Sequence, residues 1–235
     1  MLTNPEKGQI VVALDNTQVL PVPRLRLRFS LVGFIATAGA LLALITMAMH
    51  GFDENALRLG SEMAWRFTFF VFFVALIAGP LGQLLPFAPM QMLASRRRHL
   101  LWGFCASFAV YLAVVLIPNT IRPLSLHHEG LTAGMGLFII FGSLLVAVIA
   151  YSITPNAKTF FGEAARRAIL TCGIAYFWLT YALTGLSHIS GPHRPEVFYG
   201  LSVSLMVVAL LLRFADRLAR KLRMRAPEPD PALVR

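Results

Sequence analysis

The chain has 235 residues, of which 57% are hydrophobic and 14% charged, and its formal net charge is +10. A soluble domain carries about 25% charged residues and about 45–50% apolar ones, so this composition excludes an ordinary soluble enzyme or binding domain. The basic residues lie between apolar runs rather than on one soluble face. That placement argues against nucleic acid as a partner and makes the lipid bilayer, with its anionic headgroups, the expected one.

Six apolar runs are long enough to cross a bilayer core, which takes about 17–25 residues per helix. They are Phe29–Met49, Phe67–Leu85, Leu100–Ile117, Leu131–Ile153, Ala168–Leu186 and Phe198–Phe214. Proline, glycine and charged residues separate them, and Pro80, inside the second run, predicts a kinked helix. The sequence therefore predicts an all-α fold, an integral membrane bundle of six transmembrane helices.

The loop charges predict an orientation for this bundle. Seventeen of the 21 Lys and Arg residues fall on one side of the six runs, and only Arg58, Arg66, Arg122 and Arg194 fall on the other. Basic loops stay in the cytoplasm, so both termini are predicted to be cytoplasmic. The expected domains are a cytoplasmic N-terminal segment (1–25), a six-helix transmembrane domain (26–217) and a basic, then Pro-rich, cytoplasmic tail (218–235).

Several short motifs lie at the ends of the predicted helices. Arg66 directly precedes the second run, and Pro80 follows fourteen residues later. The basic pair Arg97-Arg98 precedes the third run, and Tyr151-Ser152-Ile153-Thr154 ends the fourth. A second basic pair, Arg166-Arg167, follows in the next loop.

With these motifs the region 29–214 resembles the ferric-reductase-like transmembrane domain, especially the MsrQ/YedZ-type haem subunits of bacterial inner membranes. The resemblance implies a bacterial inner-membrane location and a separate redox partner protein. It also implies haem b, held by histidines of the third and fifth spans. The positions that match those histidines are Tyr111, Ile169 and Ala182. We therefore expect a member of this type that has lost its haem, with no cofactor.

If haem b is bound nonetheless, four residues are candidates to hold it: Arg66, Tyr111, His50 and His188. Arg66 would meet a haem propionate, or else extend to lipid phosphates. Tyr111 would be a tyrosinate ligand, or else a hydroxyl bonded between helices. We predict no catalytic residue and no metal ligand.

Most histidines lie at the predicted outer ends of the helices, and acidic residues accompany them. Together they form either a wet polar surface or an outward-facing metal or haem site. The histidines are His50, His127, His128, His188 and His193, and the acids are Asp53, Glu54, Glu62, Glu129 and Glu196.

Polar side chains also mark two helix faces within the bilayer. Tyr176, Thr180 and Thr184 recur every fourth residue in the fifth run, and Ser107 and Tyr111 have the same spacing in the third. Polar groups avoid lipid, so we expect these two faces to meet. They would either bond the helices together or line a small cavity for a lipid, quinone or other ligand.

Two functions remain in view. One is a ferric-reductase-like protein related to transmembrane electron-transfer subunits but depleted of haem, with enzymatic activity left open. The other is a non-catalytic subunit that packs against a larger membrane complex. The expected protein partner is a membrane or redox protein. A permease fits less well, because the runs show no internal repeat and no mid-bilayer charge.

Overall fold

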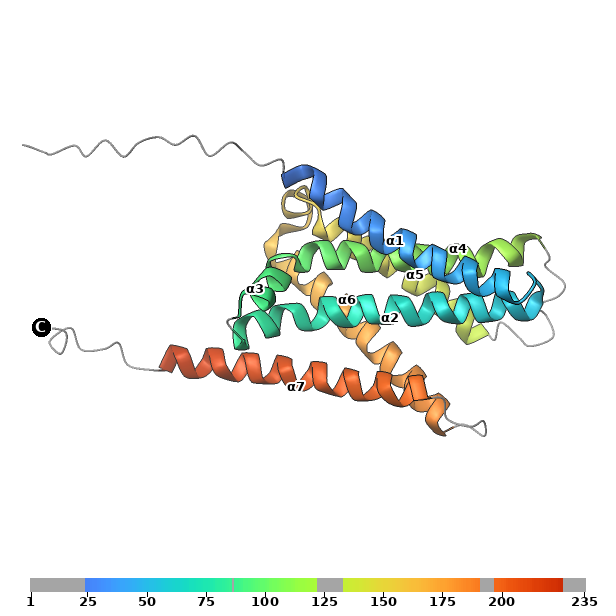
Figure 1. The fold of residues 1–235 in the computed structure, drawn as a ribbon. Coiled ribbons are helices and arrows are strands. Elements are labelled where there is room, and N and C mark those ends of the chain that lie inside the picture. Colours follow the sequence, from blue (N-terminus) through green and yellow to red (C-terminus); the bar gives the residue numbers. More distant parts are fainter. Residues whose placement is uncertain (1–23, 86, 122–132, 191–196, 226–235) are drawn as a thin grey trace, which may run out of the picture.

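A computed structural model describes residues 24–85, 87–121, 133–190 and 197–225 (Figure 1). Within these ranges the regular secondary structure is all α-helix, which confirms the predicted all-α class. The helices are α1 (Arg24–Met49), α2 (Glu54–Leu84), α3 (Ala88–Ser95), α4 (Arg97–Ile121), α5 (Ala133–Ile153), α6 (Ala157–Ser190) and α7 (Val197–Arg225). Nearly all of the predicted N-terminal segment, and the Pro-rich part of the tail, lie outside the described residues.

Several of these helices can cross a membrane. Five are long and apolar enough: Leu31–Met49, Glu54–Leu84, Arg97–Leu116, Ala157–Ser190 and Val197–Leu222. In α5 the apolar stretch counted on the same basis is shorter, Phe138–Ile153. The full 21 residues of α5 are about 30 Å long, which is close to the thickness of a bilayer core. The count of six spans stays a prediction.

α2 and α6 begin well before the predicted spans, at Glu54 and at Ala157, and the short α3 was not expected. α2 begins at Glu54, where the Asp53 side chain accepts a hydrogen bond from the Ala56 amide at 2.7 Å and caps the helix. It continues past Pro80 to Leu84. The short α3 lies in a break that the sequence marks with prolines. Pro89 is compatible with this helix because it stands in the first turn, where a backbone N–H would have no partner within the helix.

The helices form an antiparallel bundle. One end gathers the starts of α1, α4 and α6 with the finishes of α2, α5 and α7, and α3 lies at the same end (Figure 1). We call this the basic end, because Arg96–Arg98, Lys158, Arg166 and the arginines of α7 lie there. We call the opposite end the outer end. α1, α2 and α4 pack extensively on one another, and α6 crosses the bundle obliquely to meet α7.

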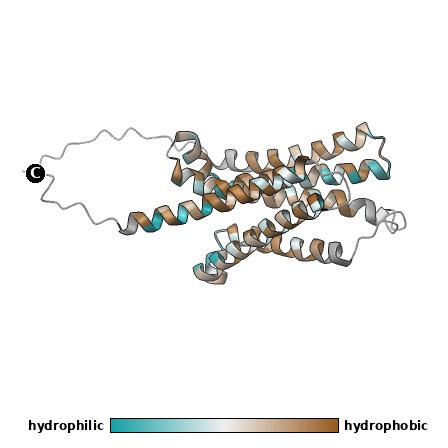
Figure 2. Cartoon of the chain, turned by 90° about the horizontal axis from the view of Figure 1, so that it is seen from below, coloured by the Kyte–Doolittle hydropathy of each residue, from teal (hydrophilic) through white to brown (hydrophobic). Residues whose placement is uncertain are grey.

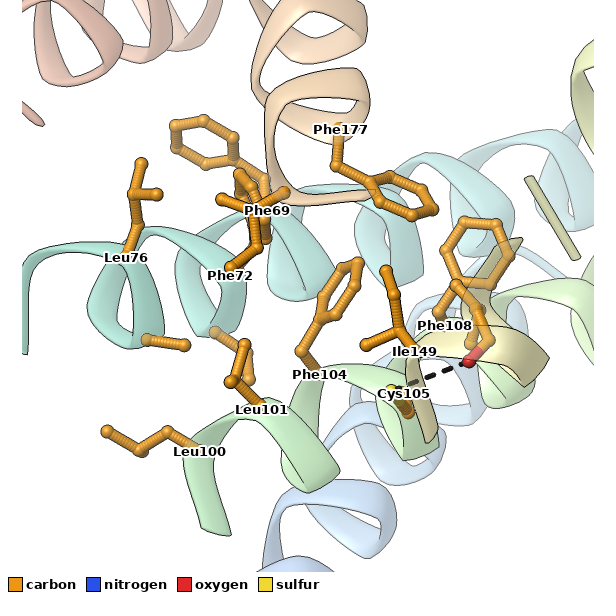
Figure 3. Packing of buried hydrophobic residues seen from close by; sticks show 14 of the residues in the cluster. Phe69, Phe72, Leu76, Leu100, Leu101, Phe104, Cys105, Phe108, Ile149 and Phe177 are labelled. Carbon is orange, nitrogen blue, oxygen red and sulfur yellow. Dashed lines mark hydrogen bonds between the residues drawn. The ribbon is translucent and has the colours of Figure 1, made fainter. Parts of the chain in front are cut away.

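Aromatic rings dominate the core. Phe72 of α2, Phe104 and Phe108 of α4 and Phe177 of α6 are each at most 1% exposed (Figure 3). The Phe104 ring centroid lies 5.0 Å from those of both Phe72 and Phe177. Such pairs add about 0.5–1.5 kcal/mol each beyond the area they bury.

The outside of the bundle is also apolar. Large side chains such as Phe34, Ile140 and Leu211 are more than 60% exposed. Figure 2 shows that most residues along the helices are hydrophobic, and that hydrophilic residues gather toward the C-terminal end of α7. An apolar exterior around an apolar core is expected of helices that face lipid.

Candidate functional site

Two of the four candidate residues line one cavity at the outer end. His50 follows α1, and Arg66 projects from the fourth turn of α2. The cavity has a volume of about 310 Å³ and is lined by Thr46, His50, Leu59, Glu62, Met63 and Arg66. The sequence separates His50 from Arg66 by sixteen residues, and the α1–α2 hairpin brings them together.

Arg66 also connects α2 to α7. Its guanidinium lies 3.5 Å from the Glu62 carboxylate, and its central carbon lies 4.9 Å from the Phe198 ring centroid. It lies 6.0 Å from the ring of Tyr199, which stacks on His188 at 3.9 Å between centroids. Cation–π contact is favourable within about 6 Å. A third candidate, His188 of α6, therefore joins the same polar group through Tyr199.

Each histidine ring is oriented by the backbone carbonyl four residues before it. Nδ1 of His50 lies 2.8 Å from the Thr46 carbonyl oxygen, and Nδ1 of His188 lies 2.8 Å from that of Thr184. A carbonyl oxygen only accepts, so Nδ1 carries the proton and Nε2 keeps the lone pair in the neutral ring.

No group of three His, Cys, Asp or Glu side chains suited to a metal occurs in the described ranges. Several members of the alternative outward-facing site lie outside those ranges: His127, His128, Glu129, His193 and Glu196.

The fourth candidate, Tyr111, lies apart from this group, inside the bundle. It is 5% exposed, and its ring centroid is 5.2 Å from that of Trp65. Trp65 in turn lies 4.5 Å from Tyr181 of α6. Tyr181 is 2% exposed, and within the described part of the chain its buried hydroxyl has no hydrogen-bond partner.

The expected meeting of two polar faces is wrong at Tyr176. Among the described residues, its ring neighbours outside α6 are Phe138 and Phe141 of α5, the latter at 5.2 Å between centroids. Phe177, the next residue along α6, packs against Phe104 and Phe108 of α4. Tyr181, one turn further on, packs against Trp65, Phe69 and Phe72 of α2. Ser107 of α4 donates to the Phe104 carbonyl of its own helix at 2.9 Å, and no hydrogen bond of its side chain to another helix occurs among the described residues.

Tyr181 does not belong to the polar stripe of the fifth run, because the inward face of α6 is aromatic. A signal was present in the sequence. Phe177 and Tyr181 are one helical turn apart, as are Phe104 and Phe108 on α4. Matching aromatic pairs on two apolar helices favour contact between them as well as polar pairs do.

The interior does not fit a haem group at the positions that the resemblance implies. Tyr111 and Ala182 are buried and Ile169 is half-buried, and none of the three is histidine. A macrocycle also needs an open slot between helices. Between α2, α4 and α6 the described rings already touch, with Phe72 5.5 Å from Tyr181 and Phe108 5.4 Å from Phe177.

No family model, curated protein or solved structure matches this chain.

Proposed function

We propose that this chain is a haem-free membrane protein of the ferric-reductase-like type, which acts as a non-catalytic subunit against a membrane or redox partner. It would cross a bacterial inner membrane six times, with both termini in the cytoplasm. Electron transfer would then belong to other proteins.

The observation that carries the proposal is the aromatic filling between α2, α4 and α6, which we call the aromatic plug: Phe72, Phe104, Phe108, Phe177 and Tyr181. Each of these side chains is 2% exposed or less, so the bundle closes without a cofactor. A scaffold that had lost its haem would need such a replacement, because an empty slot of that size costs several kcal/mol of packing.

The cofactor half of the proposal is tested by absorption spectroscopy. The full chain is expressed in cells supplied with a haem precursor, purified in detergent, and recorded oxidised and dithionite-reduced. We expect no Soret band and no reduced α/β bands. A stoichiometric band would overturn the proposal, and His50→Ala, His188→Ala and Tyr111→Phe would then show which side chain holds the iron.

The subunit half is tested in native membranes. The full chain, extracted in mild detergent, should migrate on a native gel well above the mass of its own detergent complex, and cross-linking should join it to the same protein in repeated preparations. Migration as the chain alone at every detergent concentration would contradict a subunit role. It would leave the spectroscopic result standing.

A further inference from the structure

A second cavity lies at the basic end, between α4, α5 and α6 and beside α3. Its volume is about 380 Å³, within the range of small-molecule sites. Four of its lining residues are cationic, and none is acidic. The cations are Arg97, Arg98, Lys158 and Arg166, and the others are Ala94, Ser95, Leu101, Ile153, Thr154, Pro155, Leu170 and Ile174.

Three helices hold these cations in place. Arg98 donates a hydrogen bond to the Ile153 carbonyl, which ties the first turn of α4 to the end of α5. Lys158 and Arg166 belong to α6, on either side of Gly162, where the backbone leaves helical geometry at φ 73°. The site therefore depends on the tertiary fold and not on a run of basic sequence.

The cavity keeps an excess of positive charge. Glu163 is the acid of α6 beside the cavity, and its carboxylate lies 2.9 Å from Arg166 and 3.0 Å from Arg167. A second acid, Asp216 of α7, acts on Arg97 but is itself paired with Arg220. Glu163 precedes the apolar part of α6, and hydrogen bonds from the two arginines lower its pKa to about 2, so it stays ionised. It balances one cation of α6. The buried Nε of Arg97 has no hydrogen-bond partner in the described ranges.

The lining changes from charged to apolar with depth. On α6, Arg166, Leu170 and Ile174 follow one another at every fourth residue, so one helix face presents a cation at the rim and hydrocarbon toward the bundle centre. On α4, Leu101 lies one turn inward from Arg97. A soluble phosphate would need only the cations, whereas a phospholipid uses both parts.

We propose that this cavity binds the phosphate of an anionic phospholipid. Arg98, Lys158 and Arg166 contact the headgroup, and the start of an acyl chain lies against Leu101, Leu170 and Ile174. Basic pockets between helices at the cytoplasmic face suit such headgroups. The site does not depend on the haem-free function proposed above.

The test uses the full chain, delipidated in detergent and titrated with dioctanoyl phosphatidylglycerol, with bound lipid counted by native mass spectrometry. We expect one lipid per chain at low ionic strength. Dioctanoyl phosphatidylcholine should bind at least about tenfold more weakly, since it carries no net charge. Inorganic phosphate should not displace the lipid.

Two substitutions and a matched control locate the site. Arg166→Gln and Lys158→Gln should each weaken phosphatidylglycerol binding about fivefold. Arg167→Gln is the control, because Arg167 pairs with the same Glu163 but does not line the cavity. Melting temperatures without lipid identify any variant that is misfolded, and the exposed Lys158 provides a second variant if Arg166→Gln is unstable.

Three outcomes would overturn the proposal. Equal binding of the two lipids would remove the preference for an anion. Binding of inorganic phosphate as tightly as the lipid would make this a soluble-phosphate site. Equal losses in Arg167→Gln and Arg166→Gln would indicate general surface attraction and no defined cavity.

Discussion

At the scale of single residues, Gly82 lets α3 lie directly on α2. A Cβ atom added to Gly82 would be 2.3 Å from the Ala94 Cβ and 3.1 Å from the Met90 carbonyl oxygen. Neither neighbour is the end of a flexible side chain, so the helices themselves must separate. We expect Gly82→Ala to destabilise the protein by about 1–3 kcal/mol, measured as a lower melting temperature in detergent.

Gly33→Ala is the control for this substitution. A Cβ at Gly33 of α1 would meet nothing within 4 Å, and alanine favours helix by up to about 1 kcal/mol over glycine. The melting temperature should therefore stay the same or rise. If Gly82→Ala behaved like Gly33→Ala, the close packing of α3 on α2 would be wrong.

Residue roles at the site were only partly accessible from sequence. The outer position of His50 and Arg66 follows from counting along helices, and the structure places both in one cavity. Which side of α6 faces inward did not follow. Tyr176 and Tyr181 both lie in an apolar helix, and either could face the bundle interior. Which of them does so depends on how the side chains of neighbouring helices pack, and in a membrane protein the polarity of a residue predicts this poorly.

At the scale of elements, α6 consists of two helical pieces joined at Gly162. The φ of 73° and ψ of 161° there belong to a region open essentially to glycine alone. A Cβ at Gly162 meets nothing within 4 Å, so a substitution would suffer from backbone strain and not from crowding. Gly162→Ala should cost about 1–3 kcal/mol, read as a lower melting temperature.

Gly200→Ala provides the comparison. Gly200 lies in the first turn of α7 with ordinary helical geometry and open space around it. It should show no loss. A loss of the same size in both variants would mean that glycine-to-alanine changes act here through something other than the bend in α6.

The six long helices were predictable from the apolar runs, whereas the short α3 and the helix ends were less so. Each predicted span overlaps a helix, because long apolar runs have few alternatives in a membrane protein. The start of α2 was misjudged by thirteen residues, since Arg58, Glu62 and Arg66 interrupt the hydropathy without interrupting the helix. Their charges lie at the outer end, where Glu62 and Arg66 pair with each other. Hydropathy measures the lipid-facing length, and hydrogen bonding decides the helical length.

At the scale of the whole molecule, the basic residues gather at one end. The guanidiniums of Arg97 and Arg213 repel each other electrostatically across α4 and α7, and Arg97 also interacts with Asp216 and Arg220. These residues are more than 100 positions apart in the chain. The loop-by-loop alternation of charge, from which the orientation was predicted, therefore corresponds to one charged end of the described bundle. Which side of the membrane it faces remains a prediction.

Cysteine labelling tests that orientation and the crossing of α5 together. The native thiols are first removed by Cys105→Ala and Cys172→Ala, and single cysteines are introduced by Asn55→Cys, Asn156→Cys or Arg217→Cys, at exposed positions. α2, α4 and the shorter α5 separate the first two positions, and α6 and α7 separate the last two. A membrane-impermeant maleimide added to intact spheroplasts should label Asn55→Cys alone, and lysis should expose the other two.

Labelling of Asn156→Cys together with Asn55→Cys would mean that α5 does not cross. Labelling of Asn156→Cys and Arg217→Cys without lysis, with Asn55→Cys protected, would invert the orientation and overrule the charge bias of the loops.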